Sequence, residues 1–481
     1  MDKKIKFSLK SEESKATEQD RQVLEAAYRA WMGWEQFRLS RKRNKDYTYG
    51  RQWGDIRHDD DGNPISEGDY VRLCGKEPLT NNMLRQLIKC VVGRFRKTLS
   101  DEKQQGGDDY QSNFIDEIDS RALEEFLISG CCVQRVEWAD EQSGSGVWIE
   151  NVNVNRFFCN RMEDPRGHDC EIIGCLHNMR LSELIRRLAD GNIQAARRIR
   201  NAYAAPQSIY QSAAIGQDGA TNSRFWHGSD GKCRAIEVWT LELAEVLRCH
   251  DTLTAQLTIL PASKAKEIEQ QNAMRRKEGK EEIIVNWSVA QEWHCRWFAP
   301  SGVLLRHFTS PFAHHSHPFV FKLYPLTDGE IHSFIEDVID QQKYVNRLIT
   351  SIDHIMSASA KGVLLFPTEA LPDGYTWGDV RKMWSNCNGI IPIDTDRSAS
   401  LPQQVVSRSN DTGAYQLLTT QMKLIEQISG VTSVLQGQQV SGNQSAELYQ
   451  TQMENSETAL ADIYGSFAAF RTQRQVKAQN L

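Results

Sequence analysis

The chain has 481 residues, of which 40% are hydrophobic and 25% are charged, and its formal net charge at pH 7 is −6. That length is sufficient for two or three domains with sizeable cores. The negative charge argues against a tight, general nucleic-acid binder, because neutralising phosphates requires surplus Lys and Arg. No apolar run approaches the roughly 20 residues that a membrane-spanning helix needs, so we expect no membrane partner.

The cysteines and the N-terminal residues restrict the class of protein further. The eleven cysteines are scattered, and neither close pair, Cys131–Cys132 or Cys170 with Cys175, has the spacing of a CxxC motif. This distribution predicts small buried hydrophobic side chains in a reducing compartment. The first residues, MDKKIKFSLKSEESK, are charged and contain no apolar stretch of the kind found in a secretory signal.

Three amphipathic helices are predicted before residue 130, over residues 17–40, 77–97 and 116–129. An aromatic cluster, DYTYGRQW (46–53), lies between the first two. Aromatic residues in such a cluster more often pack in a core than stack on bases. The helix over 17–40 presents one apolar face, formed by Leu24, Ala27, Tyr28, Trp31 and Trp34.

From Gln134 the hydrophobic period changes from that of a helix towards two, which is typical of strands. VQRVEW, the loop EQSGSG and VWIENVNVNRFF predict a hairpin. A helix over 182–203 follows, and strand-like runs return at 235–243, 246–259 and 284–306, with a basic, helix-prone insert at 263–281. We therefore interpret residues 1–332 as one α+β body with an antiparallel sheet.

The remaining residues have a simpler layout. A long helix is predicted over 333–360, a strand-and-turn segment over 361–406, a second helix over 412–429 and a third over 445–471. The middle segment is too small for a deep core of its own, which favours a ring or array of subunits that stabilise one another. On the second helix we expect an inner apolar face formed by Ala414, Leu417, Leu418, Met422, Ile425 and Ile428. The charged residues of the helix over 333–360 are Glu336, Asp337, Asp340, Lys343, Arg347 and Asp353.

A polar segment links the second and third of these helices, in QISGVTSVLQGQQVSGNQSAELYQ (427–450). A loop so rich in Gly, Gln, Ser and Asn cannot build a core. It contains no nucleophile with a matching base, no metal ligands and no phosphate-binding motif. Such a loop suits an element that contacts a long polar molecule without binding it tightly.

Motifs for chemistry are missing from the sequence. The Gly-Lys pairs are followed by Glu77, Cys233 and Glu281, and never by the Ser or Thr that completes a phosphate loop. Neither GxSxG nor HExxH occurs. The histidines His314, His315 and His317 have no Cys or carboxylate at ligand spacing, so a solvated loop is favoured over a metal site. We predict no catalytic residue, no metal and no cofactor.

Several segments resemble one protein family when they are taken in order. Residues 49–53 (YGRQW) followed by LTNNMLRQLIKCVVGRFRK resemble the N-terminal region of the portal proteins of short-tailed bacteriophages, with its G-x-Q-W, L-T-x-N and V-x-x-V-V-G progression. NRFFCNRMEDPRGHDCEIIGCLHNMRLSELIRRL and FAHHSHPFVFKLYPLTDGEIHSFIEDVIDQQKYVNRLIT resemble later passages of the same family. The order SGVT, LQG, SG, A resembles its tunnel-loop region.

The resemblance implies a portal-like α+β ring subunit with named parts. Residues 1–332 would form a wing together with a C-terminal helix in 446–481, with a minimal crown or none. Residues 333–360 and 407–429 would be two long stem helices, and 361–406 a small α/β clip. Residues 430–445 would be a tunnel loop flanked by helices.

By the same resemblance, the function is that of a portal. Family members form a ring of about twelve subunits at one capsid vertex, through which double-stranded DNA is packaged and ejected, and they perform no chemistry. The implied partners are the terminase large subunit, the major capsid protein and a head–tail adaptor. The implied location is the virion, after assembly in the host cytoplasm.

Two sets of residues are candidates for contact with DNA. The stem candidates are the six charged residues of the helix over 333–360. The tunnel-loop candidates are Gln436, Gln438, Gln439, Ser441, Asn443 and Gln444. Another oligomeric head–tail adaptor or a capsid-shell protein is the alternative, and an enzyme such as a terminase or nuclease would need a phosphate loop or a carboxylate metal cluster.

Overall fold

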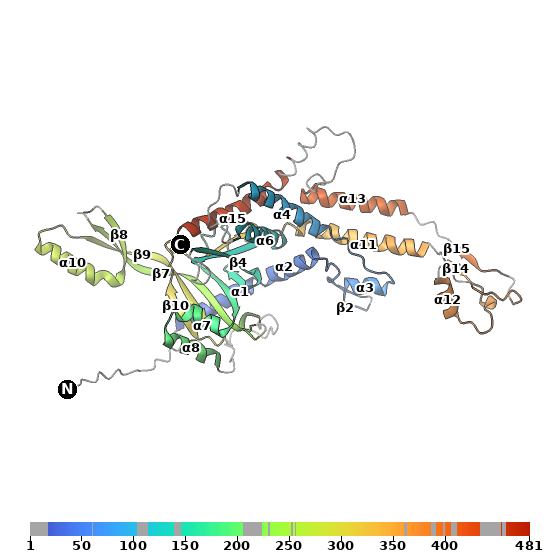
Figure 1. The fold of residues 1–481 in the computed structure, drawn as a ribbon, viewed down its shortest axis with the longest axis horizontal. Helices are drawn as coiled ribbons and strands as arrows, with labels where there is room; N and C mark the ends of the chain where they lie inside the picture. The colour runs from blue at the N-terminus through green and yellow to red at the C-terminus, as the bar shows by residue number, and fades with distance from the viewer. Residues whose placement is uncertain are drawn as a thin grey trace. The chain divides into compact units, whose positions relative to one another are not determined.

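The fold is taken from a computed structural model of the chain (Figure 1). It is described for residues 18–481, apart from residues 60, 103–113, 139–145, 205–223, 229–230, 252–253, 255, 360–362, 386–390, 398–399, 406–410, 433–453 and 455–457.

The chain folds into two compact units. Unit 1 comprises Met1–Lys45, Cys90–Phe334 and Met453–Leu481, and unit 2 comprises Asp46–Lys89 and Ile335–Gln452. The expected end of the first body at residue 332 lies close to the division at Phe334. Residues 46–89, which we expected in that body, instead group with unit 2. Hydrogen bonds described below explain that grouping.

The main sheet of unit 1 is antiparallel and has the order β10-β9-β7-β6-β5, with β8 paired to the outer half of β7. Its strands are β5 (Phe157–Cys159), β6 (Ile172–Met179), β7 (Cys233–Asp251), β8 (Gln256–Pro261), β9 (Ile284–Phe298) and β10 (Leu304–Thr309). The runs predicted at 235–243 and 246–259 thus belong to one long strand and its neighbour.

A second antiparallel sheet has the order β11-β3-β4. It contains the predicted hairpin, β3 (Cys131–Trp138) and β4 (Val147–Asn151), together with β11 (Phe319–Leu323). The small pair β12 (Pro325–Thr327) and β13 (Glu330–Ile331) follows it, and the short helix η2 (Val154–Arg156) precedes β5.

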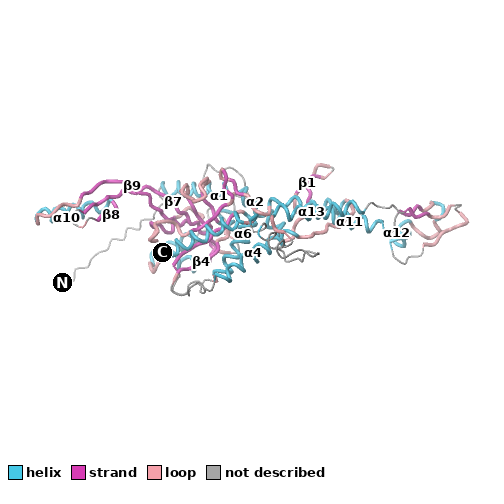
Figure 2. Tube along the Cα trace, turned by 90° about the horizontal axis from the view of Figure 1, so that it is seen from above, coloured by secondary structure: helices cyan, strands magenta, loops and turns pink. Residues whose placement is uncertain are grey.

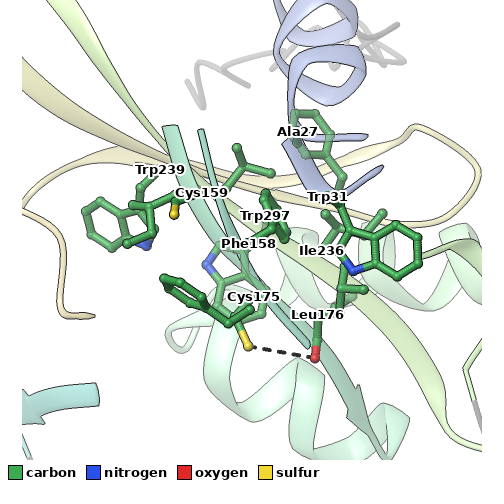
Figure 3. Packing of buried hydrophobic residues seen from close by; sticks show 14 of the residues in the cluster. Ala27, Trp31, Phe158, Cys159, Cys175, Leu176, Ile236, Trp239 and Trp297 are labelled. Carbon is green, nitrogen blue, oxygen red and sulfur yellow. Dashed lines mark hydrogen bonds between the residues drawn. The ribbon is translucent and has the colours of Figure 1, made fainter. Parts of the chain in front are cut away.

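The core of unit 1 lies between helix α1 (Glu18–Gly33) and the main sheet. Every residue of the apolar face predicted for this helix is buried. Figure 3 shows Ala27 and Trp31 of α1 close to Phe158, Ile236 and Trp297. Burying side chains of this size stabilises a fold by about 1.5–3 kcal/mol each, so this face holds α1 on the sheet.

Most of the other helices follow the predicted segments, although α4 begins in unit 2 and α15 extends well beyond the helix predicted over 445–471. Two predicted helices are each interrupted: α2 (Glu35–Thr48) starts after Gly33–Trp34, and α8 starts after Asp190 and Gly191, both of which have positive φ. The remaining bounds are α4 (Met83–Glu102), α6 (Ile115–Ser129), α7 (Leu181–Ala189), α8 (Ile193–Ala204), η3 (Ala262–Lys264), α10 (Ala265–Lys277) and α15 (Ala461–Gln479).

Helix α15 is fixed to unit 1 by buried charges. The carboxylate of Asp119, on α6, is fully buried and accepts hydrogen bonds from Arg471 and Arg474. The Lys477 amine donates to the carbonyl oxygens of His317 (2.6 Å) and Phe319 (2.7 Å), and burial lowers the pKa of Lys477 to about 7. The last helix is therefore part of the unit 1 core.

Unit 2 is built around two long helices, α11 (Glu336–Ser359) and α13 (Asp411–Ser429). Between them in the chain, the segment predicted as a small module contains β14 paired antiparallel with β15, and a helix between these strands. The shorter elements of the unit are β1 (Ile56–His58), β2 (Pro64–Ser66), α3 (Glu67–Leu73), β14 (Val363–Leu365), η4 (Thr368–Ala370), α12 (Trp377–Ser385) and β15 (Gln403–Val405). In the part of the chain that is described, no helix has the length and apolar character needed to cross a membrane.

Candidate functional site

The candidate site is the pair of long helices in unit 2, which carry the charged stem residues and lead into the polar segment. Figures 1 and 2 show α11 and α13 lying side by side, and contacts between them are extensive. The apolar period of α11 places Val338, Val345 and Ile352 on one side, where all three are buried. Where the C-terminal end of α11 meets the N-terminal end of α13, the Tyr415 hydroxyl lies 3.3 Å from the Met356 sulfur.

Helix α13 is covered on only part of the apolar face that its sequence predicts. Ile425 is fully buried, as expected. Leu417, Met422 and Ile428 belong to the same predicted face, yet they are 38%, 37% and 44% exposed. Leu417 and Ile428 lie on one flank of the buried Ile425 and Met422 lies on the other, so both edges of the apolar face are exposed. Isolated exposed apolar residues are ordinary, but several on one helix face mark a contact surface. Much of the inner face of α13 is thus open to solvent in the single chain.

A row of polar side chains on α11 binds the loop before α4. Gln342, Asn346 and Thr350 are spaced by four residues, so they lie above one another on the helix, and all three are buried. The Gln342 side chain accepts from the Met83 backbone N–H (3.0 Å) and donates to the Asn81 carbonyl (2.6 Å). Its amide thus satisfies one backbone donor and one backbone acceptor of the loop.

The next two members of the row continue the same pattern. The Asn346 carbonyl oxygen accepts from the Asn81 backbone N–H, and the Thr350 hydroxyl accepts from the Leu79 backbone N–H, each at 3.0 Å. A backbone group buried without a partner costs about 1–3 kcal/mol. Three successive side chains therefore hold an irregular loop against α11 by supplying the partners that its backbone needs.

Gln52 connects this row to the aromatic segment. The Asn346 amide donates to the Gln52 side-chain oxygen at 2.6 Å, and the Gln52 amide donates to the Tyr47 carbonyl and to Asn82 at 2.7 and 3.1 Å. The YGRQW and LTNN segments quoted for their resemblance thus meet on one helix. This network, hereafter the clamp, comprises Gln52, Asn81, Asn82, Gln342, Asn346 and Thr350 and explains why residues 46–89 belong to unit 2.

The two basic stem candidates are engaged inside unit 2. The Lys343 ammonium lies 2.8 Å from Asp55 and 3.7 Å from Glu67, and the Arg347 guanidinium donates to Glu67 at 2.6 Å. Glu67 is buried and Lys343 is half-buried, whereas Arg347 is exposed. The positive charges of α11 are thus partly balanced by carboxylates from the segment that the clamp holds.

The acidic stem candidates occupy different sides of α11. Glu336 and Asp340 share a side with Lys343 and Arg347, since their spacing follows the helical repeat, whereas Asp337 and Asp353 are each rotated by about 100° from it. Asp337, Asp340 and Asp353 are exposed, and Glu336 is half-buried. A hollow of about 300 Å³ brings three candidates together, and it is lined by Asp340, Gln341, Lys343, Tyr344, Arg347 and Gln421.

The tunnel-loop candidates Gln436, Gln438, Gln439, Ser441, Asn443 and Gln444 lie outside the described residues. The entrance to the segment is described as far as residue 432. Gly430 has a φ of 68°, a left-handed conformation that suits glycine after the last turn of a helix, here α13. Val431 is fully buried, and its N–H donates to the Ser429 hydroxyl at 3.2 Å.

The described residues contain no cluster of three or more His, Cys, Asp or Glu side chains that could hold a metal ion. His317 differs from the expected solvated loop. It is buried between Trp293 and Phe319, and burial holds its pKa well below the usual value. Its backbone carbonyl accepts from Lys477, so it is part of the attachment of α15.

Sequence reasoning missed Gln342, Asn346 and Thr350. We assigned α11 an apolar side and a charged side, and polar residues between them carried no prediction. A signal did exist, since three uncharged polar residues recur every fourth position beside the buried Val345. Their partners lie more than 250 residues earlier in the chain, which periodicity cannot reveal.

The stem candidates thus lie on α11, one of the two long paired helices of unit 2. A family model described as "Phage P22-like portal protein" matches residues 24–477. The chain belongs to this family of bacteriophage portal proteins, whose function is the passage of the viral genome through a channel at the capsid vertex. No curated protein matches the chain.

Members of this family are structural components of the virion, and they form ring oligomers that interact with the capsid and the terminase. The match extends over almost the whole chain, so it includes the clamp, α11, α13 and most of α15.

Proposed function

We propose that this portal protein assembles into a ring of about twelve subunits in which α11 and α13 surround the DNA channel. The observation that carries the proposal is the open inner face of α13, where Leu417, Met422 and Ile428 are more than a third exposed. In a ring, each subunit meets two neighbours, and the same apolar strip is covered once per subunit. Covering it stabilises the ring by roughly 25 cal/mol for each Å² of apolar area removed from water.

In this proposal, the parts of the chain take the roles implied by the family. The stem consists of 333–360 and 407–429, the clip of 361–406, and the tunnel loop of 430–445. Residues 1–332 and the C-terminal helix form the wing, except that the segment 46–89 braces the stem through the clamp. The clamp and the ion pairs of Lys343 and Arg347 fix residues 342–350 of α11. This bracing keeps the helix straight while DNA moves past it.

The charges exposed on α11 set how DNA moves through the channel. Every carboxylate is repeated once per subunit, so whichever of Asp340 and Asp353 faces the lumen forms an acidic belt, since the two lie about 140° apart around α11. Such belts repel phosphates and let DNA slide instead of binding. The basic residues Lys343 and Arg347 oppose this effect less than their number suggests, because Asp55 and Glu67 pair with them.

Charge reversal tests this assignment. The variant with Asp340→Lys and Asp353→Lys should form normal rings and package DNA more slowly, because reversing both positions places a new positive belt at whichever of them faces the lumen. A matched control is Glu183→Lys with Glu269→Lys, which makes the same charge change at exposed positions of α7 and α10. Packaging by purified rings and motor is the measurement. Equal rates for both variants would place the two carboxylates away from the DNA.

The tunnel loop contributes amides instead of charges. Gln436, Gln438, Gln439, Asn443 and Gln444, with the Ser441 hydroxyl, form hydrogen bonds with phosphate oxygens or water that are weak and exchange quickly. Deleting Gln436–Ser441 should leave rings intact and impair packaging or retention of DNA. Replacing the same six residues by Gly and Ala keeps the length, so it separates amide chemistry from loop length. Failure of the deletion to assemble would show that the loop is structural.

The segment 361–406 docks the terminase large subunit, and the head–tail adaptor takes its place after packaging. In its described part, Tyr375, Trp377 and Leu401 are 40%, 49% and 66% exposed. Such exposed apolar side chains suit a surface that binds another protein. The wing meets the major capsid protein, and assembly takes place in the host cytoplasm. The ring has no ATPase activity of its own. Binding of terminase to Leu401→Asp rings tests the docking surface, with unchanged binding as the contrary result.

A further inference from the structure

Unit 1 carries an arm, defined as β8, α10, residues 241–251 of β7 and residues 284–292 of β9 (Figure 1). Strand β7 lies in the middle of the arm's sheet, with β8 on one side and β9 on the other. Strand β10 reaches β9 only from His294 onward. Within the described ranges, no strand pairs with the outer edge of β8, or with that of β9 from Ile284 to Glu292. The sheet of the arm therefore has two open edges.

Neither edge carries the features that usually prevent strands from pairing. An edge strand presents backbone N–H and C=O groups that can pair with another chain, and proteins commonly block it with charges, proline or a covering segment. Residues 256–260 of β8 and 284–290 of β9 contain no charged residue and no proline. Four apolar side chains along the two strands are at least half exposed, namely Leu257 (64%), Ile259 (57%), Ile284 (50%) and Trp287 (61%). Both edges are thus templates for strand addition.

The β8 edge fits the β9 edge of another copy in direction. Strands β8 and β9 are each antiparallel to β7, so they run parallel to one another. When a second arm lies beside the first in the same orientation, its β8 adjoins β9 of the first as a parallel strand. The pairing needs no turn of either arm, so it can be repeated from one copy to the next.

The side chains of the two edges also fit when the two arms lie level. The registers with β7 place Leu257 level with Ile284, and Leu260 level with Trp287. Trp287 and Leu260 point to the face that α10 covers, since Leu247 between them packs against Ile268. Leu257 and Ile284 point to the opposite face. Apolar side chains of the two copies would therefore meet on both faces of the joined sheet.

The charges near the two edges are complementary. Lys264 and Lys266 follow the end of β8 that would lie beside Ser288, and both are exposed. Glu292 lies further along β9 in the same direction. The lysines of one copy would therefore approach a carboxylate of the next. Two β9 edges paired antiparallel around Trp287 would instead bring Glu292 of each copy close to Glu282 of the other, and like charges at such positions are destabilising.

We propose that the β9 edge of each arm pairs in parallel with the β8 edge of the arm of a second copy, so that the arms of the ring form one continuous sheet. The inference rests on the ring proposed above. A contact between two different edges is heterologous, and its repetition around a closed ring leaves no edge open. The arms thus add a backbone-paired contact between subunits to the one made by α13.

A disulfide cross-link tests the pairing. Asn286 and Ile259 are level with one another and point away from α10. Within one chain β7 separates them by two strand spacings, about 9.6 Å, which is beyond the reach of a disulfide. Mild oxidation of rings that carry Asn286→Cys with Ile259→Cys should therefore give covalent oligomers larger than a dimer, with the two peptides joined in mass spectrometry.

Two control variants identify the edges that take part. Asn286→Cys with Gln270→Cys, at an exposed position of α10, should give no such series of oligomers. Asn286→Cys alone should give no dimer, and a dimer would show that two β9 edges pair, which overturns the proposal. Rings that form without the cross-link between residues 286 and 259 would overturn this inference and leave the ring standing. A chain that stays monomeric would overturn both.

Hydrogen exchange tests the pairing without new cysteines. Asn286→Lys with Ser288→Lys places two charges on the β9 edge, where they face β8 of the next copy and its Lys264. In rings, these changes should raise the exchange of the amides of residues 257–260, although β7 lies between β9 and β8 of the same chain. The matched control, Gln270→Lys with Gln271→Lys on α10, should leave these amides protected. Equal exchange at 257–260 in the two variants would overturn the proposal.

Discussion

Helices α13 and α15 each contain 19 residues and carry an amphipathic apolar face, but only one is completed within the chain. Ile463, Phe467 and Phe470 of α15 are buried, and so is its polar residue Arg474, while Lys477 is half-buried. On α13, Ile425 is buried while much of the same face stays open. The difference indicates that α15 belongs to the fold of the subunit, and α13 to an assembly.

Units 1 and 2 also differ in the kind of polar group that they bury. In unit 1, charges are buried and paired, as in Asp119 with Arg474. In unit 2, the clamp uses uncharged amides and a hydroxyl, and the charges of α11 pair with the half-buried Asp55 and the buried Glu67. Amides satisfy a backbone loop at a smaller desolvation cost than ions. Changes in unit 1 should therefore damage folding, and changes on the open side of α13 should damage assembly.

The largest effect is expected from Asp119→Ala. This change leaves the buried guanidinium of Arg474 without its carboxylate, and loss of one partner of a buried pair costs about 3–5 kcal/mol. Denaturant unfolding at a fixed protein concentration measures the loss. In the control Glu18→Ala, the pair with Arg21 is exposed, so the expected change is about 0–1 kcal/mol. Similar losses in the two variants would refute the role given to Asp119.

A smaller loss is expected from Gln342→Leu in the clamp. It removes the hydrogen bonds from the Gln342 side chain to the Met83 N–H and the Asn81 carbonyl, which then keep only the bond to each other, and this loss costs about 1–3 kcal/mol. The matched control is Gln416→Leu at an exposed position of α13, where a change within about 0.5 kcal/mol is expected. Hydrogen exchange of the backbone amides of α11 measures how much the change loosens this helix. If α11 stays equally protected in both variants, the clamp does not brace it.

The next effect is a pH dependence centred on Lys477. Its folded pKa of about 7 lies below the unfolded value of about 10.4, so between these pH values the unfolded chain binds more protons than the native one. The contribution of Lys477 to stability therefore rises with pH, with a slope of up to about 1.4 kcal/mol per pH unit. Below pH 7 the penalty for burying its charge is present in full.

The clearest window is pH 7 to about 8.5. Above it, stability falls again, because burial raises the pKa values of thiols such as Cys131 and Cys159, which ionise only in the unfolded chain. Below pH 6.5, His317 protonates on unfolding and complicates the curve. Lys477→Met should abolish the rise measured by urea unfolding across the window. An unchanged slope in this variant would show that another group causes it.

The smallest effect on subunit stability is expected from Met422→Glu on α13. Met422 is already 37% exposed, so unfolding should change by less than about 0.5 kcal/mol, whereas ring formation should fail. The control Val476→Glu changes an exposed residue of α15, which is 52% exposed, and should leave rings intact. Analytical ultracentrifugation compares the two. Rings from both variants would mean that neighbours do not cover this part of α13.

Periodicity predicted those parts of the fold that depend on neighbours in sequence. The buried face of α1, the β3–β4 hairpin and the α11–α13 pair follow from local patterns. The predicted break near residue 245 was wrong, because pairing with β9 keeps β7 extended from Cys233 to Asp251, through the first run and into the second. The sequence showed only two separate strand-like runs, and the pairing partners of the residues between them, Ala290 and Val289, lie more than 40 residues further on.

The candidate site was predictable only in part. The charged residues of α11 could be found from sequence, but their pairing with Asp55 and Glu67 could not, since it depends on segments about 280 residues apart. The same holds for the clamp, whose amides are neither apolar nor charged. The burial of His317 was also not predicted from the sequence, because Lys477 of the last helix forms part of its environment.

If a neighbouring copy covers the open face of α13, the purified chain should form a closed ring. Native mass spectrometry of the purified chain, with imaging of the same sample, tests it directly. The account predicts a closed oligomer of about twelve copies with a central hole and no ATPase activity. A stable monomer at micromolar concentration, with α13 still helical and soluble, would contradict it.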